Sequence, residues 1–283
     1  MTEPSSFDAG PEGRDAQLSP SERRRLRFRN IPIRVVLPNL VTLLALSMGL
    51  TAIRYATEGK FDTAVTAVIA AAVLDGLDGR IARALKGTSR FGAELDSLAD
   101  FVDFGVAPAL LLYLWSLHEI KGLGWFAALV FAIACALRLA RFNVTVDEPG
   151  RPAWHSDFFV GMPAPAGAVA VLLPLYLNLS VAELPGSKAL VPLFIVYVLA
   201  IAFLMASRIP HFSGKRIGRI PREYVILVLF CVGVTALLLA IYPMETLVLA
   251  SLAYLAAIPF GVKRYKELER QEAEKAAEKA RPA

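Results

Sequence analysis

Apolar residues along the chain gather into eight long stretches that short polar segments separate. The stretches cover residues 35–54, 61–82, 95–117, 125–143, 163–182, 189–206, 223–242 and 244–262. Each is close to the roughly 20 residues that a helix needs to cross the hydrocarbon core of a membrane. The pattern predicts an all-α polytopic membrane bundle of about eight transmembrane helices, with residues 31–262 forming one membrane-embedded domain.

Two polar segments flank this domain. Residues 1–30 are rich in Ser, Pro, Gly and Arg and contain no apolar run, so they lack the apolar region of a cleavable signal peptide. They predict a disordered, basic cytoplasmic head. Residues 263–283 consist mostly of Ala, Glu, Lys and Arg and predict a charged, solvated cytoplasmic tail. We assign no chemistry to the tail.

The composition excludes an ordinary soluble domain. Over 283 residues, 56% are hydrophobic and only 19% are charged, and the mean hydropathy is +0.53. Cys135 and Cys231 lie inside apolar stretches, far apart and without a histidine at ligand spacing. They are interpreted as packing residues, because neither a disulfide framework nor a zinc site fits that spacing.

Basic residues favour one orientation in the membrane. If the N-terminus is cytoplasmic, all but four of the 30 Lys and Arg residues fall in cytoplasmic segments, the exceptions being Arg54, Lys60, Lys121 and Lys188. Cytoplasmic loops carry an excess of Lys and Arg. We therefore expect both termini in the cytoplasm. The cluster at Arg23–Arg29 is a topology signal and a contact for anionic lipid, and we expect no nucleic-acid partner.

Acidic residues inside the second and third stretches indicate function. An unpaired carboxylate in a membrane helix costs at least about 2.5–3.5 kcal/mol, and these two stretches hold Asp75, Asp78, Asp96, Asp100 and Asp103. Asp75 and Asp78 are three apart and Asp96 and Asp100 four apart, so each pair projects from one helix face. Two such faces opposed would form a four-carboxylate cup. An all-oxygen site suits hard cations, and we infer one or two bound Mg²⁺, Mn²⁺ or Ca²⁺ ions.

The segment between these two pairs carries small and basic residues. Gly76, Gly79, Ala82 and Gly92 let a ligand approach the backbone, and Arg83, Lys86 and Arg90 add positive charge. Metal-binding carboxylates, arginines and a membrane position together indicate a phosphate-bearing substrate whose other half is lipid.

One motif carries a resemblance to a known family. The pattern is Asp75-x-x-Asp78-Gly79-x-x-Ala82-Arg83, eight residues, then Gly92-x-x-x-Asp96-x-x-x-Asp100. At every specified position it resembles the signature of the CDP-alcohol phosphotransferases. Several flanking runs resemble the bacterial integral-membrane phosphatidylserine synthase branch, namely Asn39–Thr42, Ser97–Val102 with Phe104–Pro108, Ala136–Asn143 and Gly161–Ala166. The resemblance covers roughly residues 35–225.

This resemblance implies a reaction and roles for matching residues. CDP-diacylglycerol and L-serine would give phosphatidylserine and CMP, with a divalent metal required and a homodimer in the bacterial inner membrane. Asp75, Asp78 and Asp96 would bind the metal, and Asp100 would complete the cup and act as general base. The residues assigned to the CDP-lipid pocket are Gly79, Ala82, Arg83, Ser89 and Gly92.

The acceptor site rests on fewer residues. Arg138 and Arg141 lie at helical spacing near the cytoplasmic end of the fourth stretch and could hold the serine carboxylate, with Asn143 as a polar neighbour. Alternatively, either arginine extends to the lipid headgroups. Asp103 stands where the resembled branch usually has a small polar residue, so it could meet the serine ammonium or alter acceptor choice.

Two kinds of alternative remain open. Within the family, the acceptor could be glycerol 3-phosphate, inositol phosphate or choline. A different class, a divalent-cation transporter, would also place carboxylates inside the membrane. Against transport, the carboxylates lie near one membrane side and beside basic loop residues, which would repel cations in transit.

Overall fold

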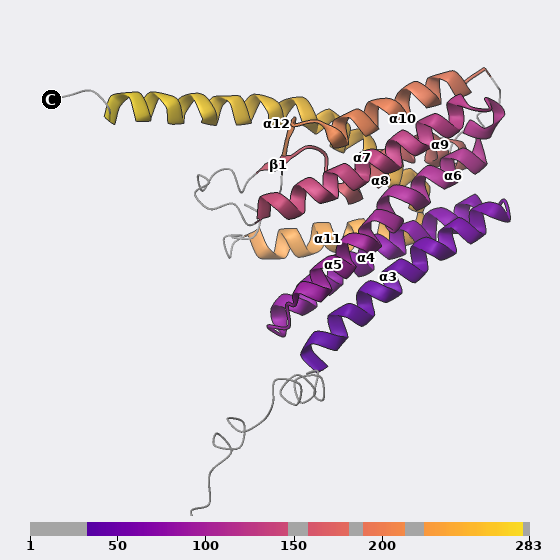
Figure 1. The fold of residues 1–283 in the computed structure, drawn as a ribbon, viewed down its shortest axis with the longest axis horizontal. Coiled ribbons are helices and arrows are strands. Elements are labelled where there is room, and N and C mark those ends of the chain that lie inside the picture. Colours follow the sequence, from indigo (N-terminus) through magenta and orange to yellow (C-terminus); the bar gives the residue numbers. More distant parts are fainter. Residues whose placement is uncertain (1–32, 147–157, 181–188, 213–223, 280–283) are drawn as a thin grey trace, which may run out of the picture.

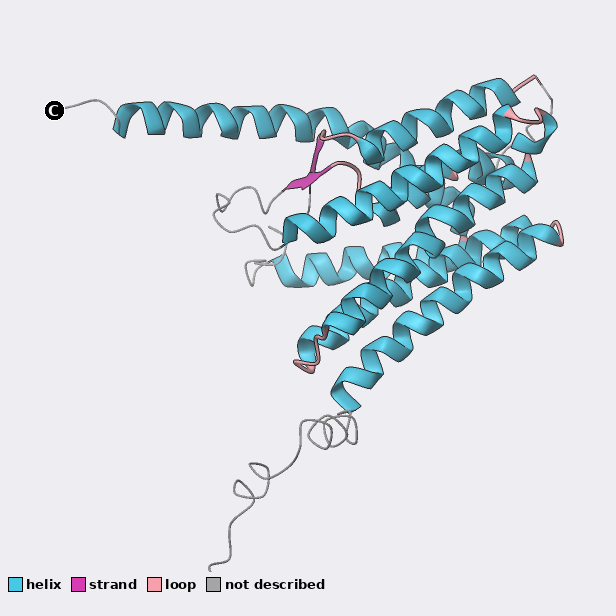
Figure 2. Ribbon diagram, viewed as in Figure 1, coloured by secondary structure: helices cyan, strands magenta, loops and turns pink. Residues whose placement is uncertain are grey.

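The computed structural model describes residues 33–146, 158–180, 189–212 and 224–279. The chain forms a bundle of helices with one pair of very short strands (Figures 1 and 2). In chain order the elements are α3 (Ile33–Thr57), α4 (Phe61–Ala84), α5 (Arg90–Asp100), η1 (Phe101–Val106), α6 (Ala107–Trp115), η2 (Leu117–Glu119), α7 (Leu123–Val146), β1 (Phe158–Val160), α8 (Ala164–Val171), α9 (Leu173–Ser180), α10 (Val191–Ala206), β2 (Pro210–Phe212), α11 (Val225–Ile241) and α12 (Pro243–Lys279).

The all-α polytopic architecture is confirmed. Helices occupy all eight ranges that the apolar pattern predicts. In the described part of the chain, four helical segments are long and apolar enough to cross a membrane, namely Ile33–Thr57, Arg90–Trp115, Leu123–Thr145 and Pro243–Gln271, and α10 and α11 are shorter apolar helices. The fifth range is divided at Leu172 into α8 and α9. Pro174 follows this break, and a proline cannot donate the backbone hydrogen bond of a continuous helix.

Of the two predicted flanking segments, the structure describes only part of the tail. The head, residues 1–30, lies outside the described residues. The first part of the tail continues α12 without a break and extends well beyond the bundle (Figure 1). Two exposed ion pairs lie on this extension, Arg264–Glu267 at 3.2 Å and Arg270–Glu274 at 2.9 Å. Within each pair the two residues are about one helical turn apart.

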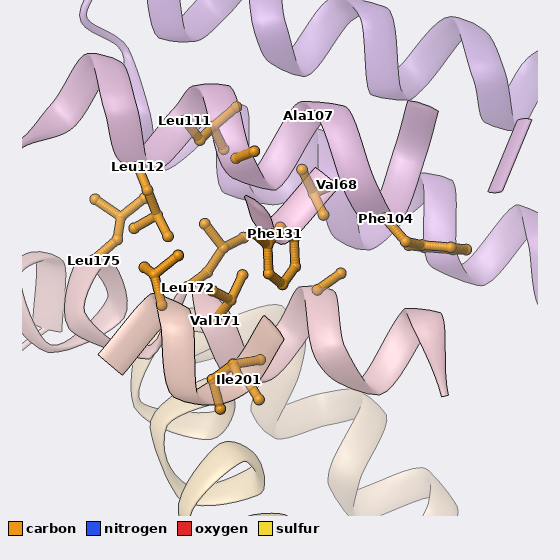
Figure 3. Packing of buried hydrophobic residues seen from close by; sticks show 14 of the residues in the cluster. Val68, Phe104, Ala107, Leu111, Leu112, Phe131, Val171, Leu172, Leu175 and Ile201 are labelled. Carbon is orange, nitrogen blue, oxygen red and sulfur yellow. The ribbon is translucent and has the colours of Figure 1, made fainter. Parts of the chain in front are cut away.

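The apolar core lies where α4, α6, α7, α8 and α10 meet. Figure 3 shows Val68, Leu111, Phe131, Val171 and Ile201, one from each of these helices, and each is at most 2% exposed. The α3–α4 pair and the α7–α10 pair make extensive contacts, and α12 packs on α8, α9 and β2. The helix α11 contains no buried residue and packs on α12.

One end of the bundle gathers the elements that form the site. The starts of α3 and α5, the end of α7 and the two strands all lie toward the same end (Figure 1). The strands pair antiparallel, with Phe159 opposite His211. Segments far apart in the sequence are therefore brought together at this end.

Candidate active site

The turn between α4 and α5 brings their polar ends together. The helix α4 ends at Ala84, and the Gly87 N–H donates to the Ala82 carbonyl at 2.9 Å across the turn. Ser89 then begins α5, where its Oγ accepts a hydrogen bond from the Gly92 N–H at 3.0 Å. This is the usual task of a helix N-cap serine. A Cβ at Gly87 would collide with the Arg34 carbonyl oxygen, so a larger residue would push the turn away from α3.

Four aspartates converge beside this turn, as their spacing predicts. Asp75 and Asp78 lie on α4, and Asp96 and Asp100 lie on α5. One carboxylate oxygen from each of Asp75, Asp78 and Asp96 lies within 4.8 Å of the other two. The Asp100 carboxyl group is in hydrogen-bond contact with that of Asp75. Asp75, Asp78 and Asp96 therefore form a cluster with Asp100 beside it, and the completion of a four-carboxylate cup by Asp100 stays a prediction.

The donor set of the cup fits a divalent cation. Oxygens bound to Mg²⁺ or Ca²⁺ lie about 2.0–2.6 Å from the ion, so two ligands of one ion are separated by at most about 5 Å. The three oxygens meet that limit. Asp78 is only 4% exposed, and its Oδ2 accepts a hydrogen bond of 2.6 Å from Thr42 Oγ1, which fixes the carboxylate orientation. Carboxylates this close repel one another unless a cation or protons lie among them.

A pocket of about 180 Å³ opens beside Asp78 and Asp96 of the cup. All five residues assigned to the CDP-lipid pocket line it, namely Gly79, Ala82, Arg83, Ser89 and Gly92. Asp75 and Asp100 are not among the residues that line this pocket. The pocket lining thus combines the carboxylates of Asp78 and Asp96 with the guanidinium of Arg83, which is the charge pattern that a metal-bound diphosphate needs.

The helix α3 supplies pocket residues that the sequence interpretation did not assign. Pro38, Asn39 and Thr42 line the pocket, and a Cβ at Gly92 would lie 2.8 Å from Asn39 Oδ1. Gly92 therefore lets α5 approach α3 closely. Asn39 and Thr42 are three residues apart, on one helix face at the start of an apolar stretch. That spacing was the signal available in the sequence, but the sequence does not show that Thr42 contacts Asp78.

Arg138 and Arg141 approach the site from α7. Two contacts set the antiparallel register of α7 against α5 and η1: Asn143 Nδ2 donates to Ser97 Oγ at 2.9 Å, and Cys135 lies against Gly105. Both arginines thus lie at the level of the segment that contains Asp100. Arg138 is 5% exposed and donates from Nε to the Met162 carbonyl at 3.1 Å.

Arg141 also has a clear structural contact. Its Nη1 donates to the carbonyl oxygens of Ala206 and Ser207, at 2.8 and 3.1 Å. These carbonyls end α10 and lack helical partners, so the arginine caps the helix. Its prediction as an acceptor ligand stays a prediction.

Asp103 occupies a different face of the same segment. It is 1% exposed within η1, a π-helical turn, and its Oδ1 has no hydrogen-bond partner among the described residues. A Cβ at Gly49 of α3 would collide with Asp103, whereas Gly105 and Phe101 face Cys135 of α7. Asp103 is thus directed toward α3 and does not share a face with Arg138. π-helical turns are frequent at functional sites.

Comparison with known proteins identifies the family. The family model described as CDP-alcohol phosphatidyltransferase matches residues 35–206. The chain belongs to the CDP-alcohol phosphatidyltransferase family. The matched range contains α4, α5 and the whole signature, and it ends with α10. The family resemblance of the motif is therefore confirmed.

Three relatives carry the name CDP-diacylglycerol–serine O-phosphatidyltransferase. The chain is 40% identical to the Mycobacterium leprae protein over 227 residues, 80% of this chain and 74% of the relative. It is 35% identical to the Helicobacter pylori protein over 193 residues, 68% and 78% of the two chains. The Bacillus subtilis relative is 33% identical over 181 residues, 62% and 91% of the two chains.

Proposed function

We propose that the chain transfers the phosphatidyl group of CDP-diacylglycerol to the hydroxyl of L-serine, giving phosphatidylserine and CMP. The observation that carries the proposal is the carboxylate cup beneath the pocket that Arg83 and Gly79 line. The names of the relatives at 33–40% identity support serine as the acceptor. The enzyme is thus a CDP-diacylglycerol–serine O-phosphatidyltransferase.

Asp75, Asp78, Asp96 and Asp100 would hold one or two divalent ions, Mg²⁺ or Mn²⁺. Such an ion would supply positive charge for the diphosphate and for the leaving CMP. Thr42 holds Asp78 in place for this task. Gly79, Ala82 and Gly92 leave room for the CDP group, and Arg83 supplies positive charge at the pocket wall. Ser89 shapes the pocket by capping α5.

Asp100 acts on the acceptor. An alcohol is a weak nucleophile until its proton is removed, so the Asp100 carboxylate takes the serine hydroxyl proton as the oxygen attacks phosphorus. One phosphorus–oxygen bond forms to serine, and the bond between that phosphorus and the CMP oxygen breaks. Arg138 and Arg141 supply positive charge for the serine carboxylate, and Asp103 influences acceptor choice from the α3 side.

We further propose how the enzyme sits in the cell. The excess of Lys and Arg in the expected cytoplasmic segments supports a cytoplasmic position for both termini and the active site, in the bacterial inner membrane. Residues 31–262 form the catalytic membrane domain, residues 1–30 a basic head and residues 263–283 a charged tail. The family resemblance supports a homodimer, which light scattering of the detergent-solubilised protein can test.

CMP release by the purified protein tests the proposed reaction. CDP-diacylglycerol and Mn²⁺ or Mg²⁺ are supplied, and L-serine, glycerol 3-phosphate, inositol phosphate and choline are offered separately. We expect CMP release only when L-serine is the acceptor. Release with another acceptor would retain the metal site and reject the acceptor assignment. Ion flux into proteoliposomes without any CMP release would favour a cation transporter instead.

A further inference from the structure

Three side chains near the strand pair have polar groups for which the described residues supply no hydrogen-bond partner. They are Arg138 of α7, His211 of β2 and Tyr254 of α12. Among the described residues Arg138 donates only from Nε, and its guanidinium carbon lies 5.4 Å from the centroid of the Phe142 ring. His211 Nε2 and the Tyr254 hydroxyl are buried and have no hydrogen-bond partner among the described residues. Unpaired buried polar atoms are costly, and two of them beside a buried arginine suit a polar ligand.

Backbone carbonyls hold Arg138 and His211 on one framework. Arg138 Nε donates to the Met162 carbonyl, and the adjacent Gly161 N–H donates to the Ile209 carbonyl at 2.9 Å. His211 Nδ1 contacts the same Ile209 carbonyl at 2.8 Å. Gly161 has φ +80°, a conformation that favours glycine, and a Cβ there would lie 2.7 Å from the Ser207 carbonyl oxygen. The framework is therefore tightly constrained.

The contact with Ile209 determines what His211 offers to a ligand. A carbonyl only accepts hydrogen bonds, so Nδ1 carries the proton and the neutral ring leaves a lone pair on Nε2. Burial, with a further contribution from the nearby Arg138 charge, lowers the pKa of His211 and keeps the ring neutral at pH 7. The buried Nε2 is consequently a hydrogen-bond acceptor.

The helix α12 positions Tyr254 beside these two groups. The Tyr254 ring stacks on His211, with ring centroids 6.2 Å apart and planes 14° apart. One turn earlier, Ser251 Oγ donates to the Val169 carbonyl at 3.3 Å and ties α12 to α8. The ring stacking and the carbonyls of Ile209 and Met162 therefore link Tyr254, His211 and Arg138. The Arg138 amino groups and the Tyr254 hydroxyl are donors and His211 Nε2 is an acceptor, the complement of a carboxylate and an ammonium.

We propose that Arg138, His211 and Tyr254 form the subsite for the zwitterionic group of the amino-acid acceptor. The Arg138 amino groups and the Tyr254 hydroxyl donate to the carboxylate, and His211 Nε2 accepts from the ammonium. Because Arg138 lies at the level of Asp100, a short amino acid held here directs its hydroxyl toward the carboxylate cup. The inference rests on the proposed function. His211 and Tyr254 lie beyond residues 35–206, so elements outside the family match would select the acceptor.

Steady-state kinetics of the full chain test the subsite, with CMP release measured against serine and against CDP-diacylglycerol. We expect Tyr254→Phe to raise the serine KM about tenfold, because a hydrogen bond to a charged group is lost. The CDP-diacylglycerol KM should not change. Tyr176→Phe is the matched control, since it removes another buried, unpartnered hydroxyl from α9 and should leave both constants unchanged.

A pair of variants tests the acceptor atom of His211. In His211→Asn the amide replaces Nδ1 and keeps the contact with Ile209, but the atom at the Nε2 position is lost. In His211→Gln the amide oxygen can reach that position. We expect Asn to raise the serine KM about tenfold and Gln to restore most of the affinity. Equal loss in both variants would indicate a merely structural histidine and would overturn its assignment.

Two serine analogues separate the roles further when used as competitors. Ethanolamine lacks the carboxylate, so its inhibition constant should be unaffected by Tyr254→Phe; 3-hydroxypropionate lacks the ammonium and should be unaffected by His211→Asn. Unchanged serine KM values in both variants, with serine-dependent CMP release by the wild type, would overturn the subsite alone. Wild-type protein that releases no CMP with serine would overturn the proposed function and the subsite with it.

Discussion

At the turn between α3 and α4, Glu58 pairs with Arg54 at 3.1 Å and with Lys60 at 2.8 Å, and both cations are largely exposed. The hydrogen bonds from Lys60 and Arg54 hold the pKa of Glu58 below its usual value. At the other end of the same two helices, the carboxylates of the cup face one another, and Asp78 is almost fully buried. Neighbouring cations neutralise Glu58 at the turn between α3 and α4, whereas the carboxylates of the cup need a bound ligand.

Asp96→Asn removes one charged ligand from the cup and should have the largest effect. We expect turnover to fall about a thousandfold or more, because electrostatic support of the departing group is lost. CMP release at saturating Mn²⁺ measures the change. Glu94→Gln is the matched control, an exposed carboxylate on the same helix that should tolerate the substitution. Near-normal activity of Asp96→Asn would contradict the four-carboxylate cup.

Asp100→Asn separates proton removal from substrate binding. We expect kcat to fall about a hundredfold or more, as for the loss of a general base, while the CDP-diacylglycerol KM stays near the wild-type value. Initial-rate kinetics against both substrates provide the measurement. A variant whose only defect was a raised lipid KM would argue against the role of Asp100 as base.

Thr42→Val tests the support given to a metal ligand. The substitution removes the 2.6 Å hydrogen bond to Asp78 and nearly preserves side-chain shape. We expect the Mn²⁺ concentration for half-maximal activity to rise roughly tenfold, the usual size of such an effect. Glu58→Gln, in the turn after α3 where Glu58 pairs with Arg54 and Lys60, should leave the metal requirement unchanged. An unchanged requirement in Thr42→Val would remove Thr42 from the site.

Arg141→Ala should have the smallest of these effects. We expect the serine KM to rise roughly three- to tenfold, since the arginine adds charge beside the acceptor while its Nη1 is bound to the end of α10. Arg54→Ala, in the last turn of α3 and away from the site, serves as the control. A change in the CDP-diacylglycerol KM alone would reassign Arg141 to the other pocket.

The sequence predicted the cluster of aspartates because the spacing within each helix is enough to bring its carboxylates together. Spacings of three and four residues place Asp75 with Asp78 and Asp96 with Asp100 on single helix faces, and an apolar surrounding makes each carboxylate conspicuous. The same reasoning located the helices, since a membrane helix must satisfy its own backbone hydrogen bonds.

Contacts between distant segments were beyond that reasoning. The Thr42–Asp78 hydrogen bond and the stacking of Tyr254 on His211 join residues whose sequence separation gives no hint of proximity. The division of the fifth range into α8 and α9 and the capping of α10 by Arg141 likewise depend on tertiary packing.

Incorporation of labelled L-serine into lipid by the purified enzyme is the most direct test of the central claim. The assay contains CDP-diacylglycerol and Mn²⁺, with a chelator in a parallel sample and Asp96→Asn as a second control. We predict that labelled lipid and CMP form in equal amounts, and that both products disappear in the chelated sample and in the variant. Labelled lipid that forms equally well with the chelator or in Asp96→Asn would contradict the account, as would the absence of labelled lipid from the wild-type reaction.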